Sequence, residues 1–359
     1  MSRKNRIGID ISQLNFGFNG ITNYIRGLVD LISGSEADLT VFQNSFKKIL
    51  PFRTAVFKFP LRNFSLRRNW DNAVLPFLAG LYGIDVMIFP YFNCPSKGKF
   101  RKISVIYDLS FLKAGSTTEE GAAYFLQGTR NSFSNADIIL TISHYIRKEL
   151  TAQFGEEKRI EVLYPRIEEG VRTRKKDPFL FLCLGTVEKR KNPQAVIDFF
   201  LRVLSAEKRA KLIFAGAVRK DYENVFLKSL NGPAGRGGGA IRYEGAVSEK
   251  RKKELLDQAA YTFYLSSYEG FGIPVIEAIS YGCIPIVSDI PVMREIGNKA
   301  CVFTGMNEPG IYELPPLFDD AFRNEFYIKG GDALDSYHDS EKAQAEHFLN
   351  LLRGTGNGK

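Results

Sequence analysis

The chain has 359 residues, which is long enough for two domains that each bury a core of their own. Its composition, 44% hydrophobic and 25% charged, is close to the globular average and excludes wholesale disorder and a fibrous repeat. The 49 Lys+Arg against 40 Asp+Glu give a formal charge of +9, which attracts nucleic acid, anionic membrane or acidic substrates without choosing among them.

The four cysteines are scattered and form no C-x-x-C pair, which argues against a disulfide framework or a closed zinc site and fits a reducing compartment. The N-terminus lacks the apolar core of a secretory signal, and no stretch approaches the ~20 apolar residues of a bilayer span. We therefore expect a cytoplasmic protein, either soluble or attached to the inner face of the membrane.

In the first half of the chain, short β-branched runs predict buried strands that alternate with amphipathic helices. The strands are expected at Arg6–Ile11, Ile84–Phe89, Ile103–Tyr107 and Asp137–Ile142. The clearest helix is Gly20–Ile32, whose apolar residues share one face and which Gly34 ends.

The segment from Leu39 to Trp70 combines basic and aromatic residues and contains no acid. Its basic residues are Lys47, Lys48, Arg53, Lys58, Arg62, Arg67 and Arg68, and its aromatic residues are Phe42, Phe46, Phe52, Phe57, Phe59, Phe64 and Trp70. Two interpretations stay open. One is an ordinary strand-and-loop region with buried aromatics and solvated charges, and the other is a surface for anionic lipid headgroups or an anionic acceptor.

The second half repeats the strand–helix alternation, so both halves predict parallel sheets covered on both faces. Strands are expected at Phe179–Leu184, Lys211–Phe214, Tyr261–Leu265 and Pro285–Ser288, and a helix at Ser248–Ala260 with Ser248 as its N-cap. The charged segment Pro165–Pro178 is expected to be a linker. The predicted architecture is two doubly wound domains, 1–165 and 166–340, around a cleft, with a helix at about 341–352 packing back on the first.

The most informative segment is Tyr261–Pro291, in which a strand runs into the loop EGFG and Pro274 then opens a helix. The helix N-terminus offers unpaired N–H groups to a phosphate, and the loop glycines let the backbone approach a ligand. Glu269 in the loop and Glu277 in the helix are placed to hold hydroxyl groups on either side. Nucleotide-sugar binding needs this combination, although each acid alone also fits a solvated or dipole-pairing role.

The string EGFGIPVIEAISYGCIPIVSDIPVMREI resembles the donor-site signature of family 4 glycosyltransferases, which are retaining enzymes with the GT-B fold of two Rossmann-like domains. Further segments agree in the right order: IDISQLNFGFNGITNYIRGL, VIYDLSF, ADIILTISHYIRKEL and LGTVEKRKN. The resemblance runs from about Arg6 to about Phe303 and weakens in the segment from Leu39 to Trp70 and in the C-terminal tail.

The resemblance implies a catalytic role for Lys191 and the neighbouring Arg190, which would neutralise the nucleotide diphosphate as it leaves. It implies that Glu277 holds the ribose hydroxyls and that Glu269 contacts the donor sugar. Asp108 is the catalytic candidate of the first domain.

The resemblance also implies that backbone N–H groups of Phe271 and Gly272 lie beside the sugar. Gly17 and Gly20 would line the cleft from the first domain. Backbone contacts near Val247 would separate GDP-mannose from UDP-sugars.

The chain departs from the family pattern at two positions. Tyr107 stands before Asp108 where members often carry a histidine, and Thr186 stands where some carry an arginine. No D-x-D is present and His144, His338 and His347 lack metal-ligand spacing, so we expect no metal site.

The resemblance therefore implies a metal-independent, retaining hexosyltransferase. We expect no cofactor, a nucleotide diphosphate sugar as donor with GDP-mannose preferred, a glycan or lipid-linked saccharide as acceptor, and no nucleic-acid partner. Three alternatives stay open: a basic nucleic-acid-binding protein, an NAD-dependent oxidoreductase, and a non-catalytic partner with the GT-B fold. The oxidoreductase would need G-x-G-x-x-G after the first strand, where this chain has only Gly17 and Gly20.

Overall fold

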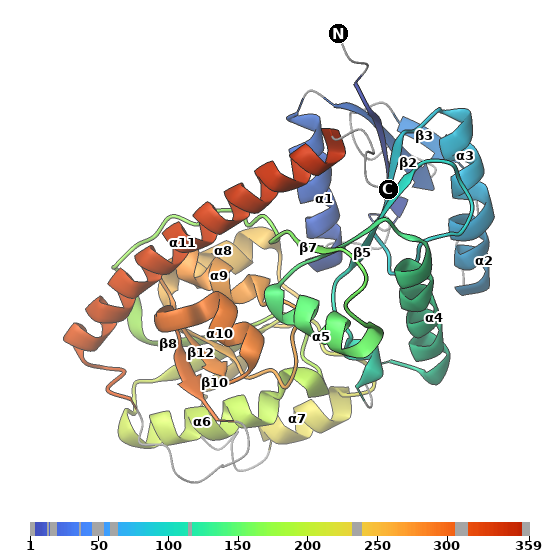
Figure 1. Cartoon of the computed structure of the whole chain (residues 1–359). Coiled ribbons are helices and arrows are strands. Elements are labelled where there is room, and N and C mark those ends of the chain that lie inside the picture. Colours follow the sequence, from blue (N-terminus) through green and yellow to red (C-terminus); the bar gives the residue numbers. More distant parts are fainter. Residues whose placement is uncertain are drawn as a thin grey trace. The chain divides into compact units, whose positions relative to one another are not determined.

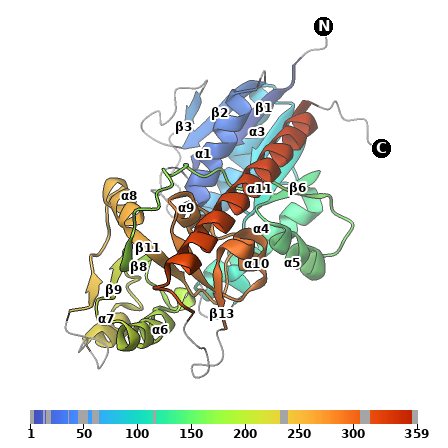
Figure 2. The same cartoon turned by 90° about the vertical axis from the view of Figure 1, so that its left-hand side faces the viewer.

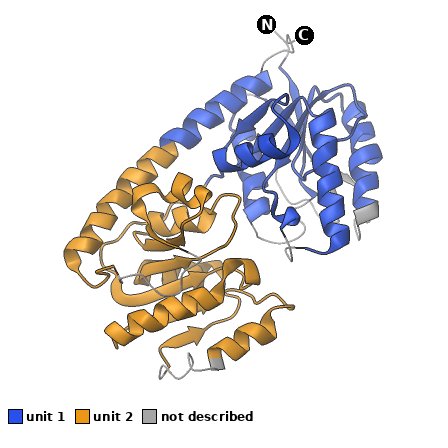
Figure 3. Cartoon of the chain, turned by 60° about the horizontal axis from the view of Figure 1, so that its bottom comes forward, with its two compact units in different colours: residues 1–166, 339–359 blue, residues 167–338 orange. Residues whose placement is uncertain are grey.

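The computed structural model describes residues 4–12, 14, 20–35, 37–44, 54–57, 64–113, 117–231, 239–305 and 315–353. The chain divides into two compact units, residues 1–166 with 339–359 and residues 167–338 (Figure 3). The division falls after Arg166, one residue beyond the domain boundary expected from the sequence.

Within the described residues, the first unit holds a parallel sheet of seven strands in the order β3-β2-β1-β4-β5-β6-β7 (Figure 1). The strands are β1 (Arg6–Asp10), β2 (Asp38–Asn44), β3 (Thr54–Phe57), β4 (Val86–Phe89), β5 (Arg101–Ile106), β6 (Ile138–Thr141) and β7 (Ile160–Val162). The helices are α1 (Gly20–Ser33), α2 (Phe64–Asn69), α3 (Leu75–Leu81), α4 (Glu119–Asn135) and α5 (His144–Phe154). This order, which reverses direction between β1 and β4, is that of a doubly wound fold.

The second unit repeats the plan, with a described parallel sheet of six strands in the order β10-β9-β8-β11-β12-β13. The strands are β8 (Asp177–Leu184), β9 (Lys211–Ala215), β10 (Ile241–Tyr243), β11 (Ala259–Tyr264), β12 (Ile284–Ser288) and β13 (Val302–Thr304). The helices are α6 (Pro193–Ala206), α7 (Glu223–Asn231), α8 (Glu249–Gln258), α9 (Ile273–Ser280) and α10 (Pro291–Gly297). The predicted α/β fold with parallel sheets is therefore confirmed.

The core of the second unit is aromatic. Phe181 of β8 stacks against two residues of the neighbouring strand β11, with its ring centroid 4.8 Å from that of Tyr261 and 5.6 Å from that of Phe263. Phe200 of α6 and Phe226 of α7 belong to the same buried cluster, so these two helices cover one face of the sheet. Figures 1 and 2 show α8 and α9 on the opposite face. Burial on both faces explains why the strands are almost continuously apolar in sequence.

The last helix, α11 (Asp320–Arg353), is longer than the helix expected at about 341–352. Its residues from Asp339 onward belong to the first unit, where the Gln344 side chain accepts a hydrogen bond from the Tyr164 N–H at 2.8 Å. Arg101 donates to the Leu351 carbonyl at 2.6 Å. None of the helices in the described part of the chain combines the length and the apolar run that a membrane crossing requires.

The basic and aromatic segment is partly interior. Phe42 and Trp70 are fully buried, and Arg67 is buried as well, so a lipid-facing role is wrong for these three residues. Arg68 is exposed. The remaining predicted contributors Phe46, Lys47, Lys48, Phe52, Arg53, Lys58, Phe59 and Arg62 lie outside the described residues.

Arg67 is held by two buried carboxylates. Its Nη2 lies 2.6 Å from Asp10 Oδ2, at the end of β1, and its Nε lies 2.9 Å from Asp71 Oδ1. The indole Nε1 of Trp70 lies 3.4 Å from the same Asp10 oxygen. Burial raises the pKa of Asp71 to about 7, against the opposing charge of Arg67 and with support from the charge of Asp10. The first unit thus buries a carboxyl group whose pKa is raised to about 7.

Candidate functional site

In the second unit, the loop after β8 is built on two glycines in close contact. The Gly185 N–H donates to the Ala215 carbonyl at 2.9 Å, which continues the pairing beyond the end of β8. Gly216 has φ +155°, and a Cβ there would stand 2.0 Å from the Gly185 oxygen. Only glycine fits at such a distance from backbone atoms. The two glycines therefore fix the start of the loop that carries the basic residues.

Arg190 follows in the 3-10 turn Lys189–Lys191, and its guanidinium lies between two carboxylates. Its Nη1 is 2.8 Å from Glu269 Oε2 and its Nη2 is 2.9 Å from Glu188 Oε1. Nη1 also donates to the Tyr268 carbonyl at 2.6 Å. Burial disfavours the charged guanidinium, but Glu269 and Glu188 outweigh it and raise the pKa of Arg190. The guanidinium of Arg190 is therefore held in place by contacts within the protein.

Glu269 is held on both of its oxygens. While Oε2 faces Arg190, Oε1 accepts a hydrogen bond from the Ser266 hydroxyl at 2.8 Å. The Ser267 N–H in turn donates to the Arg190 carbonyl at 2.9 Å, so the β11 loop and the β8 loop are joined through backbone as well as side chains. The carboxylate consequently has a defined orientation at the carboxyl edge of the sheet.

Lys191 differs from its neighbour. Its Nζ lies 2.7 Å from the point where a Cβ on Gly185 would stand, so the ammonium sits directly over that glycine. Within the described ranges no carboxylate or carbonyl pairs with this ammonium. A cation over the Gly185 backbone at the carboxyl end of β8 is available to an anion in a way that Arg190 is not.

The helix after the EGFG loop begins as the sequence predicts. Gly272 caps α9 in a left-handed conformation, φ +108°, and Pro274 lies in its first turn. Phe271 is 2% exposed and packs edge-on against Tyr337, with centroids 6.2 Å apart. Its side chain therefore anchors the loop, which leaves the backbone as the part that approaches a ligand.

Glu277 lies in α9 and is paired with a lysine of α8. Its Oε1 is 2.6 Å from Lys252 Nζ, which also contacts Glu249 at 2.8 Å. Burial lowers the pKa of Lys252, but the two carboxylates outweigh it and raise that pKa. A ligand hydroxyl at Glu277 would share the carboxylate with this lysine. Val247 follows β10 and is half-buried.

The first unit holds the candidates Asp108, Gly17 and Gly20. Asp108 Oδ1 accepts a hydrogen bond from the Ser110 N–H at 2.8 Å and so shapes the turn after β5. Tyr107 is 3% exposed and donates its hydroxyl to the Pro90 carbonyl at 3.0 Å. Burial raises the pKa of Tyr107 well above its usual value. Gly20 is the first residue of α1, and Gly17 lies outside the described residues.

The structure thus brings Arg190, Lys191 and Glu269 together in the second unit, on loops that sequence reasoning had already connected. Sequence reasoning missed Glu188, Ser266 and the Gly185–Gly216 contact. Glu188 and Gly185 lie inside the segment LGTVEKRKN, so their place in the motif was a signal for them. Nothing in the sequence indicates that Gly216 meets Gly185.

Comparison with known proteins shows which families and folds this chain is similar to. Residues 166–305 match the model of the family described as glycosyl transferases group 1. The chain is 26% identical over 260 residues to the O-antigen chain mannosyltransferase B of Escherichia coli, covering 67% of each chain. It is 36% identical over 98 residues to the GDP-mannose:cellobiosyl-diphosphopolyprenol alpha-mannosyltransferase of Xanthomonas oryzae, covering 27% of this chain and 25% of that protein.

Among solved structures, the sucrose-phosphate synthase of Thermosynechococcus elongatus aligns with a TM-score of 0.72 at 13% identity, covering 98% of each chain. At that identity the likeness shows the fold. Together with the two Rossmann-like units, it confirms the predicted GT-B fold, and the family match confirms the predicted resemblance to glycosyltransferases.

Proposed function

We propose, from the match of residues 166–305 to the group 1 glycosyl transferase family, that the chain is a retaining hexosyltransferase. It moves a hexose from a nucleotide diphosphate sugar to a hydroxyl of a glycan or of a lipid-linked saccharide. The names of its relatives favour mannose as the sugar and GDP as the nucleotide. They also favour a place in the biosynthesis of a surface polysaccharide such as lipopolysaccharide.

The observation that carries the proposal is the ammonium of Lys191 over Gly185, which pairs with no carboxylate in the described part of the chain. A nucleotide diphosphate that leaves the sugar develops negative charge, and a cation fixed in advance stabilises that charge in the transition state. Because Lys191 supplies the positive charge, transfer is expected to continue in the presence of a metal chelator.

Glu269 is proposed to contact the donor sugar, and Arg190 to hold that carboxylate in position. A carboxylate with both oxygens engaged, by Arg190 at 2.8 Å and Ser266 at 2.8 Å, is oriented before the substrate arrives. Its preorganisation costs nothing at the moment of reaction. In a retaining transfer the leaving phosphate accepts the proton of the acceptor hydroxyl, so Glu269 need not act as a base.

A nucleotide screen by thermal shift tests the donor site. GDP is expected to stabilise the wild type, and a ligand at 100 times its dissociation constant contributes about 2.7 kcal/mol. Lys191→Ala should lose this shift, while Lys189→Ala, an exposed lysine of the same turn, should keep it. Stabilisation by UDP or ADP in place of GDP would show that the donor carries a different nucleotide. Equal thermal shifts in the two variants would show that Lys191 does not bind the nucleotide.

The chemistry is tested separately with GDP-mannose and a polyprenyl-diphosphate oligosaccharide acceptor, with chelator present. The product's anomeric configuration, read by NMR, should be that of the donor. An inverted anomeric centre would contradict the retaining mechanism, and a requirement for metal would contradict the role given to Lys191.

A further inference from the structure

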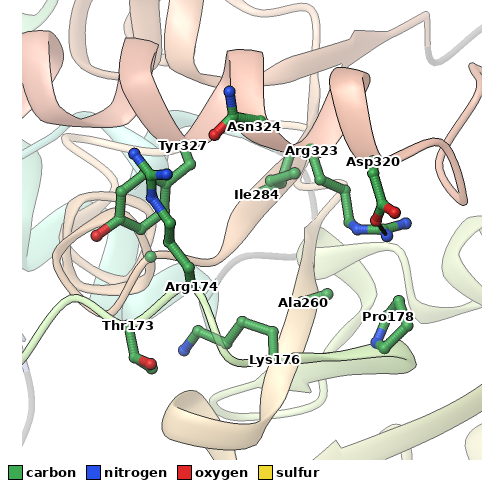
Figure 4. Close-up of a pocket in the computed structure, with 11 residues that line it drawn as sticks. Thr173, Arg174, Lys176, Pro178, Ala260, Ile284, Asp320, Arg323, Asn324 and Tyr327 are labelled. Atoms are coloured by element: carbon green, nitrogen blue, oxygen red, sulfur yellow. Dashed lines mark hydrogen bonds and ion pairs between the residues drawn. The ribbon is translucent and has the colours of Figure 1, made fainter.

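A pocket with a cavity volume of about 390 Å³ lies in the second unit, and Figure 4 shows the residues that line it. Pro178, Ala260 and Ile284, which line it, lie at or next to the amino ends of β8, β11 and β12. The candidate donor residues follow the carboxyl ends of the same sheet, so the two sites are at opposite ends of the strands. The remaining wall comes from the segment before β8, from Gly282 just before β12 and from the first turns of α11.

The pocket is strongly basic. Arg174, Lys176 and Arg323 line it, and among its described lining residues Asp320 is the one acid. Asp320 already pairs with Arg323, and its side chain is 96% exposed. Counting these charges, three positive and one negative, leaves a surplus of two positive charges around the cavity.

The two basic residues before β8 have no carboxylate partner among the described residues. The guanidinium of Arg174 lies 4.8 Å from the centre of the Tyr327 ring, and Figure 4 shows the two side chains next to each other. Lys176 Nζ donates to the Leu256 carbonyl at 2.6 Å and lies 3.9 Å from Cys283 Sγ, and both of these partners are uncharged. Burial lowers the pKa of Lys176, and this effect outweighs the opposing influence of Cys283 and of the charge of Asp257.

The wall that faces Arg174 is fixed by another arginine. Arg172 stacks on the Tyr327 ring with its guanidinium 4.2 Å from the ring centre, and it also donates to the Tyr327 carbonyl. A Cβ at Gly330 or Gly331 would stand 3.0 or 2.8 Å from the guanidinium nitrogens, so the glycine pair in α11 makes room for this contact. Arg172 is thus held by the Tyr327 ring and by the helix backbone, whereas the contact described for Arg174 is with the ring.

We propose that this pocket is a second anion site, which binds a phosphate group between Arg174 and Lys176 with Arg323 on the far side. A phosphate monoester carries about −1.5 to −2 charges near neutral pH, which matches the surplus around the cavity. A guanidinium presents a planar fork to two phosphate oxygens, and the ammonium acts as a compact point charge beside it. The phosphate comes either from a soluble phosphorylated compound or from a phospholipid headgroup.

The proposed anion site is separate from the candidate donor site. The test uses a Lys191→Ala background, so that phosphate bound by the proposed donor cation does not contribute to the signal. The probe is inorganic phosphate, compared with sodium chloride at equal ionic strength, and the readout is the melting temperature and isothermal titration calorimetry. Arg174→Glu reverses the charge of an exposed lining side chain. Lys175→Glu makes the same charge change at the exposed neighbour, which does not line the pocket.

Phosphate is expected to raise the melting temperature of the background and of the Lys175→Glu variant. In Arg174→Glu its dissociation constant should be at least 10-fold larger. A second variant, Asn324→Glu, places a carboxylate at an exposed lining position of α11 and should weaken phosphate binding in the same way. Circular dichroism confirms that each variant is folded. Equal phosphate affinity in Arg174→Glu and Lys175→Glu would overturn a soluble phosphate ligand.

A second arm uses sedimentation with equimolar phosphatidylcholine and phosphatidic acid vesicles, and with phosphatidylcholine alone. Binding to the acidic vesicles that Arg174→Glu loses and Lys175→Glu keeps identifies a headgroup as the source. A response to free phosphate without vesicle binding identifies a soluble compound. If neither probe distinguishes the two variants, the pocket is not an anion site.

Discussion

Arg190 Nη1 lies 2.8 Å from Glu269 Oε2, so the two residues that the motifs assign to opposite ends of the donor are paired with each other. Glu188 completes the arrangement at 2.9 Å on the other side of the guanidinium. An arginine that already satisfies two carboxylates and a carbonyl cannot also be the main cation for a diphosphate. The pairing supports the proposed roles, in which Arg190 orients Glu269 and Lys191 binds the phosphates.

Arg190→Met should destabilise the second unit while leaving nucleotide affinity nearly unchanged. The change leaves two carboxylates without their cation, and we expect a loss of about 1–2 kcal/mol because the pair is partly screened by solvent. Sugar transfer should decrease more than nucleotide binding, since Glu269 is then no longer held. Urea unfolding and GDP titration measure the two effects. A variant of unchanged stability that no longer binds GDP would make Arg190 a phosphate ligand.

Gly216→Ala should be among the costliest single changes in the second unit. The new Cβ would stand 2.0 Å from the Gly185 oxygen, so one of two backbone segments must move. We expect a loss of about 3 kcal/mol in the free energy of unfolding, together with weaker GDP binding because the Lys191 loop shifts. Gly245→Ala is the matched control, because Gly245 also has a positive φ, +71°, but has open space around it. That variant should lose only about 1 kcal/mol, and equal losses would contradict the close contact.

Asp71→Asn should flatten the pH dependence of stability. Burial raises the pKa of Asp71 to about 7, so the folded state holds a proton that the unfolded chain releases from about pH 4 upward. Stability from this group is full below the unfolded pKa and decreases as the pH rises toward 7. The wild type should lose about 4 kcal/mol between pH 4 and 8 through this group.

Urea midpoints across this pH range measure the effect of Asp71. The Asp71→Asn variant should lack that part of the slope, and Asp198→Asn, a change at an exposed carboxylate of α6, should keep it. Parallel profiles for all three proteins would show that Asp71 is already ionised when folded.

Tyr107→Phe should affect stability and leave transfer alone. The hydroxyl donates to the Pro90 carbonyl at 3.0 Å within the interior of the first unit, and its loss leaves that carbonyl unpaired. We expect a cost of about 1 kcal/mol in the free energy of unfolding and a turnover within about twofold of the wild type. A 10-fold decrease in turnover without loss of stability would instead give Tyr107 a part in the reaction.

Much of the fold could be predicted because each sheet is buried on both faces, so its central strands are short apolar runs. Prediction placed β1, β8, β9 and β12 within two residues of their observed starts and ends. Three-residue strands such as β7, β10 and β13 were missed, because so short a stretch has no readable period. Helix α11 was predicted at less than half its length, since its first turns carry many charges and a glycine pair.

The candidate site was predictable where one segment carried it, as in the loop and helix that contain Glu269 and Glu277. The site was not predictable where it depends on ion pairs between residues that are far apart in the sequence. The pattern around Arg67 suggested an exposed cation, and only the fold reveals that Asp10, far away in the chain, buries it. The same holds for Arg190 and Glu269, because a motif shows each residue type but not its partner.

Trp70 is the single tryptophan of the chain, and it lies fully buried against the Asp10–Arg67 pair. Tryptophan fluorescence therefore reports on the first unit, residues 1–166 with 339–359, without labelling. Circular dichroism sees both units, so a difference between the two melting curves would reveal whether they unfold together. The chain thus contains its own reporter for asking whether a ligand of the second unit stabilises the first.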